Sequence, residues 1–484
     1  MSTDADEVWQ RLSPRMLLVH PVHEVLRQVP LLIGSVVLGS ATGNPMWTLF
    51  GLALVVGYGV ARWFTTTYRI DTGQVQMRTG VLQRNVLSVP RNRIRSVSTD
   101  ARLLHRLLGL TVLRVSTGQE AKGDRAFALD AVQAEQVPRL RAILLADSLA
   151  PAEDEASEPG RELARWQPSW LRYSPLSFTG LAMILAAVGL AYQAGAGAAL
   201  QNSRLARSGL DAAERFGVVA SVVVIAVAVL VASVVLSVGR SLLTYGNLVL
   251  RRDADVLHLE HGLLRVRERT YDMRRLRGGT LREPLLVRLF GGARLDAVMT
   301  GVDGAGEASL LLPPCPRATA EMVLAELIAR PEAVTGALRR HGAVATRRRW
   351  TRALALPAVL LVAMVALYTW TPVWMWPVLA VLVVCCALMA VDRSRALGHR
   401  VDAQWLVARA GSLDRRRDCI AAAGIIGWTV RQTLLQRRAG VATLIAATAA
   451  GVKSYRVIDV PAELAWSIAG SASPWVADSE WATT

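Results

Sequence analysis

The seven residues Leu103-Leu104-His105-Arg106-Leu107-Leu108-Gly109 decide how this chain is organised, because their pattern occurs three times. It returns as Leu285-Leu286-Val287-Arg288-Leu289-Phe290-Gly291 and as Leu434-Leu435-Gln436-Arg437-Arg438-Ala439-Gly440. Each copy ends 29 residues after another glycine, and these opening glycines are Gly80, Gly262 and Gly411. A constant spacing together with a constant Leu-Leu-x-Arg-x-x-Gly element indicates a unit that has been triplicated.

The sequence around this element alternates between apolar and polar residues, as strands do. In the first unit, 68–71 and 75–78 flank a turn at Thr72-Gly73, and 82–89 and 110–117 continue the strand pattern. A helix is predicted after the strands of each unit, over about 131–146, 317–329 and 461–469. Several strands followed by one helix are typical of a small barrel or sandwich with a helical plug.

The first unit resembles a bacterial pleckstrin-homology-like (PH-like) domain. The stretches that carry the resemblance are Tyr68-Arg-Ile-Asp, Gly80-Val-Leu, Val89-Pro-Arg-Asn-Arg-Ile-Arg-Ser-Val and Leu103 to Leu110. The resemblance implies three PH-like β-barrels, each capped by a C-terminal helix, at 64–146, 240–330 and 392–470. The third is degenerate, because Ala421-Ala-Ala-Gly-Ile replaces the Pro-Arg-x-Arg-Ile stretch. Such domains commonly follow transmembrane hairpins, and the family has no established enzymatic activity.

The composition points to a membrane protein. The 484 residues are 52% hydrophobic and only 19% charged, against about 25% charged in a soluble domain. Four cysteines are too few for a disulfide-built secreted scaffold. Long uncharged stretches, two of them broken at Asn44-Pro45 and Thr371-Pro372, predict six spans that form three hairpins. The predicted spans are 25–43, 46–63, 174–195, 216–239, 353–371 and 373–391.

The positive charge indicates how the spans are oriented. The net charge of +17 comes almost entirely from arginine, and the arginines concentrate in the longer connections. The positive-inside rule places those connections and both termini in the cytoplasm. We therefore expect a multi-pass α-helical plasma-membrane protein with six transmembrane helices and three cytoplasmic PH-like domains. Its remaining parts are the N-terminal segment 1–24, the hairpins 25–63, 174–239 and 353–391, an acidic linker 147–173, a basic linker 331–352 and a tail 471–484.

Arginines are the candidate site residues. Arg91, Arg93 and Arg95 form a basic run, and each would add about 1 kcal/mol of attraction to anionic lipid at the membrane surface. Arg106 and Arg288 occupy the same place in two repeats, where a guanidinium could grip a lipid phosphate. The alternative is structural: the leucines are core, the glycine is a turn with positive φ, and the arginine binds a local carboxylate or carbonyl. The basic run is then only a solvated, positive-inside face.

These patterns favour a binding protein over an enzyme. The cysteines lack Cys-x-x-Cys spacing, and the sequence has neither a phosphate-binding loop nor a nucleophile elbow, so we expect no metal, no cofactor and no catalysis. We expect no nucleic-acid binding either, because the basic residues lack an aromatic platform. The leading interpretation is a non-enzymatic scaffold that binds protein partners or inner-leaflet lipid, in envelope homeostasis. By analogy, a smaller relative of the family is the protein partner. The alternative is a transporter or channel component built from the six helices, although uncharged spans disfavour it.

Overall fold

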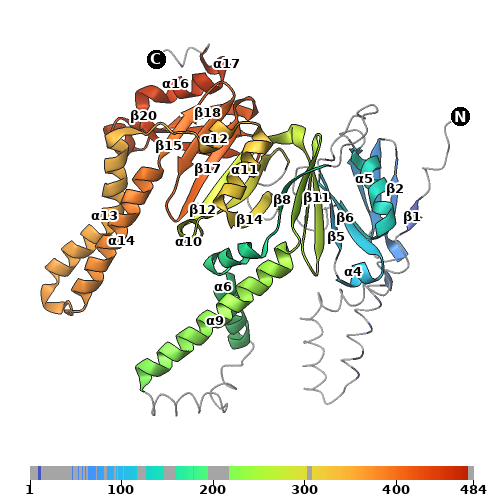
Figure 1. Cartoon of the computed structure of the whole chain (residues 1–484), viewed down its shortest axis with the longest axis horizontal. Helices are drawn as coiled ribbons and strands as arrows, with labels where there is room; N and C mark the ends of the chain where they lie inside the picture. The colour runs from blue at the N-terminus through green and yellow to red at the C-terminus, as the bar shows by residue number, and fades with distance from the viewer. Residues whose placement is uncertain are drawn as a thin grey trace. The chain divides into compact units, whose positions relative to one another are not determined.

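The chain divides into two compact units in a computed structural model. The first contains Met1–Trp166 and Leu243–Arg275, and the second contains Gln167–Leu242 and Leu276–Thr484. Figure 1 shows the strands and helices of both, coloured along the chain. The structure describes residues 9–11, 46, 49, 53, 57, 60–61, 64–71, 73–80, 84–91, 94, 96–101, 103–116, 127–145, 160–177, 179–193, 217–301 and 308–477.

The first unit holds two antiparallel sheets. The smaller has the order β1 (Gln10–Arg11), β2 (Thr67–Ile70), β3 (Gln74–Thr79), β4 (Asn85–Pro90). The larger has the order β7 (Phe127–Gln133), β6 (Leu110–Ser116), β5 (Ser96–Ala101), β11 (Val266–Asp272), β10 (Val256–His261), β9 (Val249–Asp253), β8 (Arg161–Arg165). β2, β3, β4 and β6 cover most of the predicted strands at 68–71, 75–78, 82–89 and 110–117, of which residues 82, 83 and 117 lie outside the described residues. Alternate residues of these strands, such as Val75 and Leu113, lie in one apolar core. β8 lies inside the stretch that the sequence assigned to a linker.

The second unit repeats this arrangement. Its six-stranded sheet has the order β14 (Leu310–Pro316), β13 (Gly292–Met299), β12 (Leu276–Pro284), β17 (Asp414–Ala421), β16 (Trp405–Ala410), β15 (Gly398–Val401). Its three-stranded sheet has the order β18 (Ile425–Arg431), β19 (Val441–Thr448), β20 (Ser454–Pro461). Residues from both sheets, including Leu406, Ile420 and Leu444, form a continuous buried core.

Consecutive repeats share a sheet, which the sequence does not predict. β5 of the first repeat pairs with β11 of the second, with Ala101 opposite Val266. β12 of the second repeat pairs with β17 of the third, with Glu283 opposite Arg415. When the repeats are aligned on their opening glycines, these two pairs occupy equivalent positions. The two junctions therefore have the same register.

One helix follows the last strand of each repeat. These helices are α5 (Val137–Leu145), α11 (Arg317–Ile328) and α16 (Ala462–Ala472). The first begins later than predicted because β7 continues to Gln133. Each helix or its preceding turn is attached to the repeated glycine, since Ala134, Arg317 and Ala462 donate their backbone N–H groups to the carbonyls of Gly109, Gly291 and Gly440 at 2.9, 3.0 and 3.0 Å.

Three described helices are long and apolar enough to cross a membrane: α9 (Val218–Tyr245), α13 (Gly342–Ala366) and α14 (Met375–Ala396). A fourth crossing is present if the bent segment made of η4 (Pro168–Tyr173), η5 (Pro175–Ser177) and α6 (Thr179–Gln193) counts as one. The predicted break at Thr371-Pro372 falls between α13 and α14. α13 begins within the predicted basic linker, so Arg347 to Arg349 belong to the same helix as the predicted span. The first predicted hairpin lies outside the described residues apart from isolated positions.

Candidate membrane-interaction site

Each Leu-Leu-x-Arg-x-x-Gly element forms a short helix that ends at its glycine. The helices are α4 (Leu103–Leu107), α10 (Leu285–Leu289) and α15 (Leu434–Arg438). The glycines that follow have φ values of 67°, 72° and 66° at Gly109, Gly291 and Gly440. Residues with a Cβ rarely adopt this left-handed conformation, so the predicted turn with positive φ is confirmed.

The arginine of the element contacts the next repeat. Arg106 donates to the carbonyl of Leu263 at 3.0 Å, and Arg288 donates to the carbonyl of Ser412 at 3.3 Å. Leu263 and Ser412 each follow the glycine that opens the next repeat. Arg288 also makes an ion pair of 2.8 Å with Asp392. Both side chains thus make the structural contacts that were the alternative to lipid binding.

The remaining predicted site residues are only partly placed. Arg91 donates to the carbonyl of Ile143 in α5, which holds this arginine against the C-terminal helix of the first repeat. Arg93 and Arg95 lie outside the described residues. Headgroup binding by these arginines, and by Arg106 and Arg288, stays a prediction.

Large apolar side chains project from all three short helices. They are Leu103 and Leu107 on α4, Leu289 and Phe290 at the end of α10, and Leu434 and Leu435 on α15, with exposures from 50% to 84%. We call these three pairs the apolar tips. The structural interpretation of the sequence, in which the leucines of this element are core, is therefore wrong for these leucines. The contrast with the buried Val287 of the same element shows that only one face of α10 packs inward.

The apolar tips lie beside the domain-side ends of the three helices that are long and apolar enough to cross a membrane. Arg288 of α10 binds Asp392 in the last two turns of α14. Arg348, near the start of α13, donates to the carbonyl of Leu435 in α15. Beside α4, Leu263 accepts from Arg106 and donates its own N–H to the carbonyl of Leu243, near the end of α9, at 3.1 Å. All three tips are therefore close to one end of an apolar helix that is long enough to span a membrane.

A family comparison accounts for the triplication. The family model of the bacterial PH domain matches residues 24–148, 184–331 and 352–470. The chain belongs to the bacterial PH domain family. The second match begins within α6 and the third within α13, so both include part of an apolar helix together with the strands that follow it. Comparisons with curated proteins and with solved structures find no significant match.

A polar cavity of about 450 Å³ lies within the second unit of this bacterial PH protein, lined by β12, β13, β16, β17 and β20. Burial raises the pKa of Asp418 to about 6, against the opposing effects of a hydrogen bond from Thr280 and the charges of Arg416 and Arg282. Burial likewise raises the pKa of Asp296, although Arg294 contacts it at 2.8 Å. The cavity therefore holds two carboxyl groups that resist ionisation.

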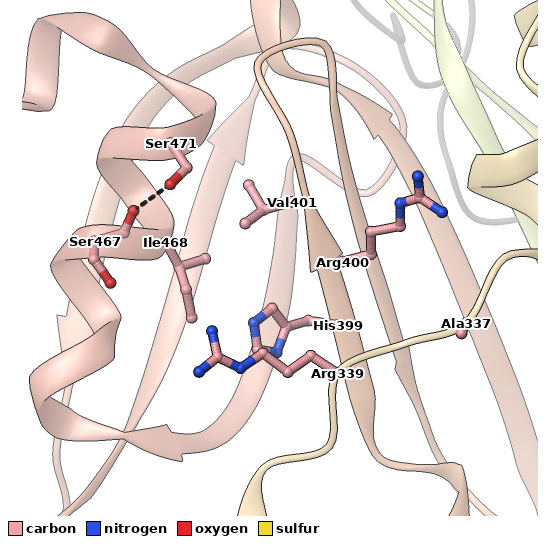
Figure 2. A pocket seen from close by; sticks show the side chains of 8 residues that line it. All are labelled: Ala337, Arg339, His399, Arg400, Val401, Ser467, Ile468 and Ser471. Atoms are coloured by element: carbon pink, nitrogen blue, oxygen red, sulfur yellow. Dashed lines mark hydrogen bonds between the residues drawn. The ribbon is translucent and has the colours of Figure 1, made fainter.

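A second cavity of about 290 Å³ separates β15 from α16 in the third bacterial PH repeat. Figure 2 shows Arg339 and His399 side by side at its wall, with Ser467 and Ser471 on the facing helix. His399 contacts His341 through their ring nitrogens at 2.9 Å. Burial, followed by the charges of His341 and Arg339, lowers the pKa of His399 to about 4, so this imidazole is neutral at pH 7. His341 also contacts the carbonyl of Ile458 at 2.7 Å, so the pair links β15 to β20.

Proposed function

We propose that this bacterial PH protein is a non-enzymatic scaffold of the plasma membrane, with six transmembrane helices and both termini in the cytoplasm. Its three PH-like domains lie against the inner leaflet and bind anionic lipid and protein partners there, in envelope homeostasis. The observation that carries this proposal is the placement of the apolar tips beside the ends of the membrane helices.

The energetics favour insertion of the tips into the headgroup region. Transfer of a leucine side chain from water to an apolar environment is favourable by about 1.5–3 kcal/mol when burial is complete. Each repeat contributes two such side chains, and each nearby arginine adds about 1 kcal/mol at an anionic surface. Exposed apolar groups rimmed by basic residues are typical of surfaces that rest on a membrane.

The membrane helices give less support to the transporter alternative. The cavity of about 240 Å³ between α13 and α14 is lined by side chains such as Leu360, Met364 and Leu382. Transport of polar or charged solutes needs polar groups facing the path. This cavity instead resembles the packing gap of an apolar hairpin, which suits an anchor.

Brominated lipids test the placement of the tips. The full chain, with Cys385 and Cys386 changed to Ala, receives a single environment-sensitive probe at Leu107→Cys, Leu289→Cys or Leu434→Cys. In proteoliposomes, lipid with bromine on the acyl chain should quench all three probes strongly. A probe at Asp255→Cys is the control, because the exposed β9–β10 turn lies about 20 Å along β10 from the turn at Leu264. Equal quenching at Asp255 and at the tips would refute the proposal.

The headgroup part of the proposal needs a separate measurement. The probe at Leu107→Cys is compared in zwitterionic vesicles and in vesicles with anionic lipid, with and without Arg91, Arg93 and Arg95 changed to Gln. We expect anionic lipid to increase quenching in the parent chain and to have a smaller effect in the Gln variant. If lipid charge makes no difference to either protein, the basic run does not bind headgroups.

A further inference from the structure

The two ends of the array of repeats carry matching strand edges. β5 of the first repeat and β12 of the second repeat precede the short helices α4 and α10. Each of the two strands pairs with a strand of the next repeat. Their equivalent in the third repeat is β18, which pairs with β19 alone among the described strands. β5 and β12 pair with β11 and β17, and the strand of the first repeat at the place of β11 and β17 is β4. Within the described sheets, β4 pairs only with β3.

We propose that β18 of one copy pairs with β4 of a second copy, in the register of the two internal junctions. The chains then associate head to tail. This inference goes beyond the proposed function, because a lipid-bound scaffold needs no second copy.

The internal junctions define the register of the proposed contact. Ala101 opposite Val266 and Glu283 opposite Arg415 are the same pair in two junctions. Applying this register to the open edges places Thr429 opposite Leu87 and Arg431 opposite Asn85. All six residues of β4 then face 426–431 of β18. The register of the internal junctions therefore pairs the whole of β4 with β18, and neither strand has to be shifted.

The side chains at the open edges lack the cover that their counterparts have. Val86 of β4 and Ile426 of β18 are 56% and 69% exposed. Trp428 and Val430 of β18 are only half-buried, whereas Val97 and Thr99, which hold the same places in the paired strand β5, are buried. An exposed edge with apolar side chains is a ready template for another strand.

The repeated arginine gives independent support. Arg106 and Arg288 each donate to a backbone carbonyl of the following repeat. Arg437 is their equivalent in the third repeat, is exposed, and makes no side-chain hydrogen bond to any described residue. A second copy supplies the next repeat that Arg437 lacks.

The occupant is a second copy because the same chain carries both complementary edges. Such a contact uses a different surface on each copy, so each added copy leaves one edge open. Copies therefore add until a ring closes or a row forms. Anchoring in a bilayer confines the growing assembly to two dimensions, which raises the effective concentration of the edges.

Cysteine cross-linking in membranes tests the register. Two tagged full-length chains, both with Cys385 and Cys386 changed to Ala, are co-expressed; one carries Thr429→Cys and the other Leu87→Cys. Directly opposite residues have Cβ atoms about 4.5–5.5 Å apart, so mild oxidation should join the two chains. Arg431→Cys with Asn85→Cys is a second matched pair. The control is Thr429→Cys with Ser88→Cys, because Ser88 faces the other side of the sheet.

We expect a dimer carrying both tags from each matched pair, at least tenfold above the control. Arg437→Ala should lower its yield several-fold, whereas Arg438→Ala, at the adjacent exposed position, should not. The proposal is overturned by equal yields in matched and control pairs, by no dimer, or by dimers between two Thr429→Cys chains. It is also overturned if one chain with both cysteines closes internally without forming dimers. Bromine quenching at the apolar tips reports the proposed function separately, since it requires no second copy.

Discussion

At the scale of single residues, each junction has an ion pair at the same two positions, but the acidic and the basic residue are exchanged between the two junctions. Asp100 binds Arg265 in the first junction, and Arg282 faces Asp414 at 3.9 Å in the second. If β5 paired with β17, Asp100 would meet Asp414, and the like charges would repel. The reversal therefore distinguishes the correct neighbour from the wrong one.

The single change Arg265→Asp should destabilise the chain by about 2 kcal/mol, because it leaves the nearly buried Asp100 facing another carboxylate. The double variant Asp100→Arg with Arg265→Asp should recover most of the loss. Thermal unfolding of the purified protein in detergent measures both. Glu162→Gln is the control, since its partner Arg165 is exposed and surface pairs contribute little. A double variant no more stable than the single one would show that the charges do not interact.

A second residue-scale prediction concerns pH. The folded-state pKa of Asp418, about 6, is above the roughly 3.9 of an unfolded aspartate. The folded protein thus holds this proton more tightly, so stability from Asp418 is present below pH 4 and is lost as the pH rises through 6. Asp418→Asn should raise the melting temperature at pH 8, by an amount corresponding to about 3 kcal/mol, and have a much smaller effect at pH 4. The same gain at both values would contradict this explanation.

Residue roles were predictable only where the cause is local. The positive φ at Gly109, Gly291 and Gly440 follows from their place after a helical turn, and it is confirmed. The carbonyl bound by Arg106 belongs to Leu263, which lies 157 residues away. A pattern within one repeat identifies no such partner, so the sequence left lipid binding and structural contact as alternatives.

At the scale of elements, a buried ion cluster joins the apolar helix α13 to strand β20. Asp459 is completely buried; Arg349 contacts it at 2.8 Å and Arg348 at 3.4 Å, and Gln436 of α15 donates to it at 2.8 Å. The cluster holds the start of α13, the short helix α15 and the strand β20 in one arrangement. It explains why α13 continues through the predicted linker, since its first turns pack on the third repeat.

Asp459→Asn should cost about 3–5 kcal/mol, because it removes the charge that balances two nearly buried arginines. Asparagine tolerates the φ of 57° at this position, so the backbone is not strained by the change. Thermal unfolding measures the loss. The matched control is Glu332→Gln, which breaks the exposed pair with Arg400 and should cost less than about 1 kcal/mol. Equal losses from the two variants would show that burial does not matter.

The strands themselves were predictable, but their neighbours were not. Alternation at 68–71 and 75–78 sets the strand and its buried face, whereas the partner of β5 depends on a contact with the next repeat.

The third repeat shows a similar limit. Its 3₁₀ turn Ala422–Gly424 occupies the place of Met273–Arg275 in the second repeat, although the basic side chains are gone. The backbone is thus kept where the sequence suggested a degenerate copy.

At the scale of the whole molecule, strand sharing predicts how hydrogen exchange is distributed. The strands at the internal junctions have neighbours on both sides, so their amides open only when a large sheet separates. β4 and β18 lie at open edges, where local opening costs less. If chains associate through these edges, the exchange rates of the edge strands depend on protein density in the membrane, while those of the junction strands do not.

Amide exchange should therefore be followed by mass spectrometry at low and high protein-to-lipid ratio. Peptides covering 85–90 and 425–431 should exchange at least tenfold more slowly at high ratio, and peptides from β12 and β17 should not change. In the Arg437→Ala variant the edge strands should keep their fast exchange at both ratios, because the inter-chain contact is weakened. The prediction is contradicted if β18 exchanges slowly even at the lowest protein-to-lipid ratio and the ratio has no effect on either edge strand. The edge of β18 would then be covered within one chain.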